Sequence, residues 1–279
     1  MLKLAMMTMW TSLLLVFGAS ISIAKKYRSG VDPLIPLDMA PKSVDDMYEG
    51  CIDKMAIRVK TEFLGNEKKI NKNFALAWKE AEKRYKKQKP KHGKKPPTTL
   101  ENEQKMALDA YTLDKPEIYA EFNDAVRTQR DQYKGTFQYH SLHFFLTGAL
   151  KFLNSRKPKT ERCLTGYRRV NKKYNLGVLS KEVRFGAFTS SSMGEYPSNE
   201  KFGYETCFEI YTCLGADISL YSKFGESERE VLIPPYEIFK ITEIKKRSED
   251  KNLPCEVVLE LKSTEKALSY LNCAFFPDN

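Results

Sequence analysis

The chain has 279 residues, of which 42% are hydrophobic and 12% aromatic, enough to form a substantial hydrophobic core. This composition excludes an intrinsically disordered protein. The formal net charge is +10, and much of the excess lies in residues 83–97, which also contain three prolines and a glycine. Because Tyr85 is the only Phe, Tyr or Trp in this segment, we predict a solvated surface loop and expect no nucleic-acid partner.

Residues 1–24 have the pattern of a secretory signal peptide. Lys3 precedes an apolar run, and small residues lead to Ala24, after which cleavage is predicted. The alternative, a membrane anchor, would need about 20 apolar residues, and polar residues interrupt this run. No apolar segment follows Cys273. The sequence therefore predicts a secreted protein, residues 25–279, without a membrane anchor.

Two types of hydrophobic pattern follow each other along the chain. From residue 42 to residue 156, apolar residues recur at helical spacing and predict helices at 44–64, 71–88, 99–112, 117–133 and 138–155. From residue 163 to residue 275, short β-branched and aromatic runs predict strands at 166–170, 183–189, 204–211, 230–233, 238–244 and 255–261. Helices followed by strands indicate an α+β fold and argue against a doubly wound nucleotide-binding fold.

Six cysteines all follow the predicted signal peptide: Cys51, Cys163, Cys207, Cys213, Cys255 and Cys273. An even number in an exported chain favours disulfides, although six cysteines allow 15 pairings. Their spacing does not fit a structural zinc site. His140 and His143 lie on one predicted helix, but only His92 remains as a further histidine, so no metal site is expected.

Glu228 and Glu230 form a carboxylate pair immediately before the apolar run Val231–Pro235. Residues two apart on an extended chain project to the same side, so both carboxylates could contact one ligand. The alternative is an exposed edge strand whose charges discourage aggregation.

An arginine and a serine run precede this pair. Arg168 alternates with apolar residues within residues 166–170, which predicts a half-buried guanidinium that pairs with a carboxylate or binds a phosphate. Ser190, Ser191 and Ser192 follow a strand-like run and, taken alone, are typical of a turn.

Three segments in this order, Tyr167-Arg168, Phe188–Ser192 and Glu228–Pro235, resemble the vertebrate ecto-ADP-ribosyltransferases. Similar segments also occur at 144–147, 212–218 and 271–273, so the resemblance extends from Leu37 to Cys273. It implies one catalytic domain in which a helical part, residues 42–156, packs against a split β-sandwich, residues 163–275. It also implies that NAD binds in the cleft of this domain.

The resemblance assigns roles to four of these side chains. Arg168 would clamp the NAD phosphates, and Ser190 would orient the ribose and the catalytic glutamate. Glu230 would stabilise the oxocarbenium-like ribose that forms when nicotinamide leaves. Glu228 would position the guanidinium of the acceptor arginine and assist its deprotonation.

Other positions follow from the same resemblance. Tyr111 and Ser222 match positions that contact NAD. Two residues depart from the family pattern: Arg169 replaces a common glycine, and Ala187 replaces a common glutamine. These departures predict added bulk near the phosphates and a lost hydrogen bond to NAD.

The resemblance also implies two disulfides and leaves one pair of cysteines. The implied pairs are Cys51–Cys273 and Cys163–Cys213. We expect Cys207 and Cys255 to form a third bridge between strands, with a reduced pair as the alternative.

The function implied is transfer of ADP-ribose from NAD to arginine side chains of extracellular proteins, without a metal. Two alternatives stay open. In one, water replaces arginine and the same site hydrolyses NAD. In the other, the chain keeps the fold and acts as a secreted non-catalytic protein that binds partners through its basic loop.

Overall fold

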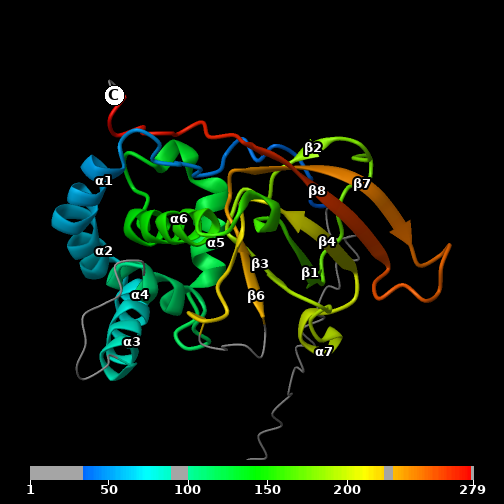
Figure 1. Cartoon of the computed structure of the whole chain (residues 1–279), viewed down its shortest axis with the longest axis horizontal. Coiled ribbons are helices and arrows are strands. Elements are labelled where there is room, and N and C mark those ends of the chain that lie inside the picture. Colours follow the sequence, from blue (N-terminus) through cyan, green and yellow to red (C-terminus); the bar gives the residue numbers. More distant parts are fainter. Residues whose placement is uncertain (1–33, 89–99, 223–228, 278–279) are drawn as a thin grey trace, which may run out of the picture. The chain divides into compact units, whose positions relative to one another are not determined.

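The computed structural model describes residues 34–88, 100–222 and 229–277 (Figure 1). The predicted signal peptide, Glu228 and most of the basic loop lie outside these ranges. The first half is helical, as predicted. Its helices are α1 (Ile52–Arg58), a π-helical turn (Val59–Phe63), α2 (Leu64–Ile70), α3 (Lys72–Gln88), α4 (Asn102–Tyr111), α5 (Tyr119–Thr128) and α6 (His140–Ser155), with short 3-10 turns at Arg130–Gln132 and Lys159–Glu161.

The first helix begins later than the predicted residue 44. Residues 44–51 form a loop in which the Asp46 carboxylate accepts a hydrogen bond from the Tyr48 backbone N–H at 2.8 Å. Tyr48 has a φ of 58°, which is incompatible with a right-handed helix. The prediction for these residues was wrong because a side chain, and not a helical carbonyl, satisfies the backbone.

The second half forms strands. They are β1 (Leu164–Val170), β2 (Glu182–Val183), β3 (Thr189–Ser192), β4 (Thr206–Thr212), β5 (Ala216–Asp217), β6 (Glu230–Ile233), β7 (Glu237–Lys246) and β8 (Val257–Ala267), with a short helix α7 (Asn199–Phe202) between β3 and β4. Within the described residues they hydrogen-bond in the order β2-β7-β8-β4-β1-β3-β6-β5. The β4–β8 pair is parallel and the other pairs are antiparallel.

The hydrophobic core shows that this sheet folds back on itself. Val231 and Ile233 of β6 belong to the same buried cluster as Phe239 and Ile241 of β7, although several strands separate β6 from β7 in the hydrogen-bonding order. Leu232 points to the opposite side, into a cluster formed mainly by the helices. A helical part therefore packs against a split β-sandwich, which confirms the α+β prediction (Figure 1).

The strand predicted at 183–189 is divided into β2 and β3. The residues between these strands are irregular, and Gly186 has a φ of +66°, which favours glycine. A Cβ atom at Gly186 would lie only 2.3 Å from the Ala40 Cβ, so the chain passes too close for a side chain. The three serines, which alone suggested a turn, instead form β3 with Thr189.

A fully buried ion pair holds the segment between β2 and β3. The Arg184 guanidinium contacts the Asp45 carboxylate at 2.7 Å, and both side chains have no exposed surface. The remaining donors of Arg184 reach the carbonyls of Met39, Ala40 and Leu268, and Asp45 also accepts hydrogen bonds from the backbone of Tyr270 and Leu271. Three distant segments of the chain thus meet at one pair of charges.

We predict that Asp45→Asn lowers the free energy of unfolding by about 3 to 5 kcal/mol, because it leaves the Arg184 charge buried without a counter-charge. Chemical denaturation with the disulfides intact measures this loss. Glu62→Gln is the control, because it breaks the exposed pair with Arg58 at 3.0 Å, which contributes about 0.5 kcal/mol or less. A loss below about 1 kcal/mol for Asp45→Asn would contradict the assignment.

A second buried network contains two groups with opposite pKa shifts. Burial raises the pKa of Asp46 from 3.8 to about 6, although Tyr133 donates a hydrogen bond to its carboxylate at 2.8 Å. Burial lowers the pKa of His143 from 6.5 to about 3. The His143 Nε2 lies 3.0 Å from the Val44 carbonyl, so it carries the proton, and Nδ1 accepts from the Tyr48 hydroxyl at 2.7 Å.

These shifts predict opposing pH dependences. The contribution of Asp46 to stability is fully present below about pH 4 and is lost as the pH rises through 6, because the folded carboxyl keeps its proton longer than the unfolded one. The contribution of His143 is present above pH 6.5 and is lost as the pH falls toward 3. Between about pH 4 and pH 6 the two contributions therefore offset each other.

The variant Asp46→Asn should separate the pH-dependent contributions of Asp46 and His143 to stability. Relative to the wild type, the free energy of unfolding of this variant should fall by about 2 kcal/mol between pH 6 and pH 4, since only the wild type gains from protonation of Asp46. Denaturant unfolding across this range tests the prediction. Parallel profiles for the two proteins would show that Asp46 does not titrate in this way.

All three expected disulfides are present: Cys51–Cys273, Cys163–Cys213 and Cys207–Cys255. The first joins residues 222 positions apart and ties the C-terminal segment, red in Figure 1, to the start of α1. The third joins β4 to the segment before β8. Among the described residues, no helix combines the length and the apolar character needed to cross a membrane.

Candidate active site

Three neighbouring strands bring Arg168, Ser190 and Glu230 together. The strand β3 lies between β1 and β6, and Ser192 pairs with both Tyr167 of β1 and Glu230 of β6. The Arg168 guanidinium donates a hydrogen bond from Nη1 to the Ser190 carbonyl at 2.7 Å. The predicted arginine, serine and glutamate therefore meet at adjacent strands, although more than 60 positions separate the first from the last in the sequence.

A glycine in β1 permits this close arrangement. A Cβ atom at Gly166 would lie 2.1 Å from the Oγ of Ser191 in β3. Any larger residue would push the two strands apart and would move Arg168 away from Ser190. The Gly-Tyr-Arg sequence of β1 is thus a packing requirement of the site.

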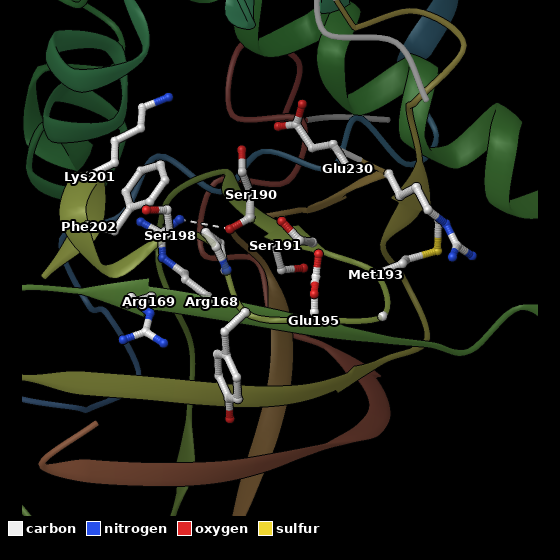
Figure 2. Close-up of a pocket in the computed structure, with 15 residues that line it drawn as sticks. Arg168, Arg169, Ser190, Ser191, Met193, Glu195, Ser198, Lys201, Phe202 and Glu230 are labelled. Atoms are coloured by element: carbon white, nitrogen blue, oxygen red, sulfur yellow. Dashed lines mark hydrogen bonds between the residues drawn. The ribbon is translucent and has the colours of Figure 1, made fainter. Parts of the chain in front are cut away.

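Two adjoining cavities of about 490 and 600 Å³ share Arg168, Ser190 and Glu230 in their walls. Both cavities also share Lys201 and Phe202 of α7. In Figure 2, Lys201 and Phe202 lie on the opposite side of Ser190 from Glu230. We call the two cavities together the cleft.

The walls of the cleft combine cations with carboxylates, which in the larger cavity are Asp114, Glu117, Glu200 and Glu230. Arg168, Lys172 and Lys201 line the larger cavity and suit an anion such as a diphosphate. Burial lowers the pKa of Arg168, but a guanidinium keeps its charge at neutral pH. Glu230 as a residue is only 7% exposed, so its carboxylate acts in a low-dielectric setting. Such an arrangement stabilises positive charge that develops close to the carboxylate.

Tyr111 supports the serine from the helical side. Its hydroxyl donates a hydrogen bond to the Phe188 carbonyl at 3.2 Å and lies 3.4 Å from the Ser190 Oγ. Burial raises the pKa of Tyr111, so the hydroxyl remains a donor at neutral pH. The structure therefore brings Tyr111 into the cleft with the three strand residues.

Asn123 is a cleft residue that sequence reasoning missed. Its Nδ2 donates to the Tyr111 hydroxyl at 3.0 Å. Its Oδ1 is buried and has no hydrogen-bond partner within the described part of the chain, so an acceptor is left available in the wall of the larger cavity. The sequence feature that could have indicated Asn123 is its position as a polar residue between the buried Phe122 and Ala125 on an amphipathic helix.

One described residue that was predicted to belong to the site does not line the cleft. Ser222 lines neither cavity, and its backbone N–H donates to the Ile218 carbonyl at 2.9 Å. Glu228 lies outside the described residues. Of the two residues that depart from the family pattern, Ala187 is fully buried and lines neither cavity.

Arg169 lines both cavities, but its guanidinium is held elsewhere. Nη1 donates to the carbonyls of Gly203 and Pro254 at 3.3 and 3.0 Å, and the guanidinium points away from Ser190 in Figure 2. Arg169 therefore contributes bulk to the wall of the cleft rather than a free charge.

The two histidines that the structure describes form structural hydrogen bonds. His140 and His143 are buried, and Glu67 accepts hydrogen bonds from the backbone of His140 and Ser141. Within the described ranges, no group of three or more His, Cys, Asp or Glu side chains could hold a metal ion.

Comparison with known proteins identifies the family of this chain. The family model described as NAD:arginine ADP-ribosyltransferase matches residues 37–267. The chain belongs to this family. It is 34% identical to the erythroblast NAD(P)(+)–arginine ADP-ribosyltransferase of Gallus gallus, over 91% of this chain and 85% of that protein. It is 32% identical to ecto-ADP-ribosyltransferase 5 of Mus musculus, over 94% of this chain and 83% of that protein.

Solved structures show the same architecture. The crystal structure of the eukaryotic mono-ADP-ribosyltransferase ART2.2 is 33% identical with a TM-score of 0.68, covering 87% of this chain and 100% of that chain. A mutant of ART2.2 in complex with NAD has a TM-score of 0.66 at 32% identity and the same coverage. The fold and the family of this chain are therefore established together.

Tyr111→Phe tests the support of Ser190. Removal of the hydroxyl should lower kcat/KM for NAD roughly tenfold, because Ser190 and the Phe188 carbonyl each lose a polar neighbour. The melting temperature should change by only a few degrees. Tyr211→Phe, at a 41% exposed position on β4, is the matched control. Steady-state kinetics indistinguishable from the wild type would remove Tyr111 from the site.

Proposed function

We propose that this protein transfers ADP-ribose from NAD to arginine side chains of proteins outside the cell and releases nicotinamide. The observation that carries the proposal is the meeting of Arg168, Ser190 and Glu230 in one cleft, in a chain that belongs to the NAD:arginine ADP-ribosyltransferase family. Relatives from Gallus gallus and Homo sapiens are named as arginine ADP-ribosyltransferases, and a related structure contains NAD.

The cleft fits the chemistry of NAD. The diphosphate of NAD needs cations. Arg168 and Lys201 line both cavities, and Lys172 lines the larger one. The nicotinamide ring of NAD needs an apolar or aromatic wall, and Phe202 is the aromatic residue common to both cavities. The reacting ribose then belongs near the boundary between the cavities, where Ser190 and Glu230 lie.

We assign the main electrostatic role to Glu230. Departure of nicotinamide leaves positive charge on the ribose, and a buried carboxylate in a fixed position stabilises that charge more than it stabilises the neutral ground state. Ser190 is placed to hydrogen-bond the ribose or the carboxylate. Arg168 anchors the phosphates, so that the ribose cannot move when its bond to nicotinamide breaks.

Glu228 is proposed to direct the acceptor arginine. It precedes Glu230 by two residues, and β6 begins at Glu230. A guanidinium is a poor nucleophile while protonated, so a second carboxylate near the reacting carbon would orient it and take up its proton. Ser222 remains a proposed NAD contact on the basis of sequence alone.

The protein is placed on the extracellular side, because disulfides form in oxidising compartments and a related protein is named an ecto-enzyme. We further propose secretion after cleavage of the signal peptide at residues 1–24, with residues 25–279 as one catalytic domain. Some relatives are named GPI-linked, so anchoring to the membrane is the alternative for this chain.

The function is tested with purified protein, labelled NAD and agmatine as a small arginine mimic. Glu230→Gln should lower both transfer and NAD hydrolysis by about 100- to 1000-fold, because the charge that stabilises the ribose cation is removed. Glu228→Gln should lose transfer to a similar extent but retain hydrolysis, because water needs no guanidinium site.

Glu182→Gln, an exposed carboxylate on β2, is the control and should keep both activities. Full transfer by Glu230→Gln would refute the mechanism, and unchanged transfer by Glu228→Gln would refute its acceptor role. Hydrolysis without transfer in the wild type would identify an NAD glycohydrolase. Absence of both reactions would favour a non-catalytic protein.

A further inference from the structure

A groove lined by lysines lies along α3, outside the cleft. It encloses about 1020 Å³, and its lysines are Lys79, Lys83, Lys86 and Lys87 of α3 together with Lys115 from the segment after α4. The helical positions recur every three to four residues, so these side chains follow one face of α3. We call this surface the lysine groove.

The acidic residues in the groove leave it positively charged. Glu80 pairs with Lys83 at 3.5 Å, and Glu82 lies 3.8 Å from Lys68, which is not part of the groove. The other lysines of the groove form no ion pair with any residue that the structure describes. Five lysines and two glutamates thus favour an anionic partner.

The groove and the cleft share a wall. Asp114, Glu117 and Tyr119 line the larger cavity of the cleft, whereas the intervening Lys115 and Pro116 line the lysine groove. One short segment therefore separates the two surfaces. A ligand in the groove would therefore lie next to the wall of the larger cavity that contains Asp114, Glu117 and Tyr119.

We propose that the lysine groove is an exosite that binds an acidic segment of the acceptor protein while an arginine of the same protein enters the cleft. This inference rests on the proposed function. The wall of the larger cavity carries four cationic side chains and four carboxylates, so the cavity itself provides no net attraction for a cationic acceptor arginine. Attraction between the groove and an acidic segment of the acceptor raises the local concentration of the arginine at the cleft.

Apolar residues in the groove favour a polypeptide over a sulfated polysaccharide. Leu76 is 55% exposed and lines the groove together with Pro116. Such contacts suit peptide side chains, whereas a polysaccharide with a sulfate on most residues has little apolar surface to bury. The acidic protein segment is therefore the occupant that this surface fits.

The test compares two arginine peptides, one flanked by Asp and Glu and one in which these residues are Asn and Gln. The wild type should have a KM for the acidic peptide about tenfold lower, with similar kcat, because several exposed ion pairs each contribute a small amount. In the variant K79Q/K83Q/K86Q/K87Q the difference should fall to about twofold or less. Transfer to agmatine should stay unchanged, and about 0.5 M salt should abolish the preference of the wild type.

The control variant is K240Q/K246Q/K262Q/K266Q, which removes the same charge from exposed positions on β7 and β8. It should keep the preference for the acidic peptide. An equal loss in both variants would overturn the exosite in favour of long-range attraction by net charge. Heparin binding that depends on the groove, with the peptide preference intact in its variant, would make the groove a polysaccharide site and overturn the proposal.

A binding measurement separates this proposal from the proposed function. Fluorescence anisotropy of a labelled acidic peptide, with its arginine replaced by glutamine, needs no catalysis. Binding about tenfold tighter to the wild type than to the groove variant supports the exosite even if agmatine is not modified. Equal affinity overturns the exosite even if agmatine is modified normally.

Discussion

Asp45 and Arg184 are buried without exposed surface, and burial of two charges is tolerated only when every polar atom around them finds a partner. The partners come from the loop before α1, the segment between β2 and β3, and the segment after β8. These three segments are remote in sequence, so the ion pair couples the two ends of the domain to its centre. The disulfide Cys51–Cys273 closes the same region covalently.

The strand β3 begins five residues after Arg184. Because this distance is short, the ion pair that stabilises the domain also affects the position of the site residues on β3. The position of Ser190 depends on how the irregular segment 184–188 leaves the ion pair. Gly186 permits that segment to pass close to Ala40, and Gly166 permits β3 to approach β1. Two glycines and one buried ion pair thereby set the position of the serine relative to Arg168 and Glu230.

The cleft lies between parts of the molecule that are stabilised in different ways. Its strand side is fixed by backbone pairing of β1, β3 and β6, whereas its helical side is fixed by side chains such as Tyr111 and Asn123. The segment after α4 forms part of this second side and also borders the lysine groove. A change in this segment could therefore affect NAD and the acceptor together.

Sequence alone determined the division into a helical half and a strand half, because periods of 3.6 and 2 in hydrophobicity report which faces are buried. The order of Arg168, Ser190 and Glu230 also identified the family without any coordinates. Only the tertiary structure decided that residues 44–51 are not helical, that the serines form a strand and that Asn123 reaches the cleft. The loop at 44–51 depends on a side chain, Asp46, that bonds the backbone of Tyr48, and hydrophobic periodicity does not report such a bond. The strand formed by the serines and the position of Asn123 depend on contacts with other elements, such as that of Asn123 with Tyr111, about which local patterns carry no information.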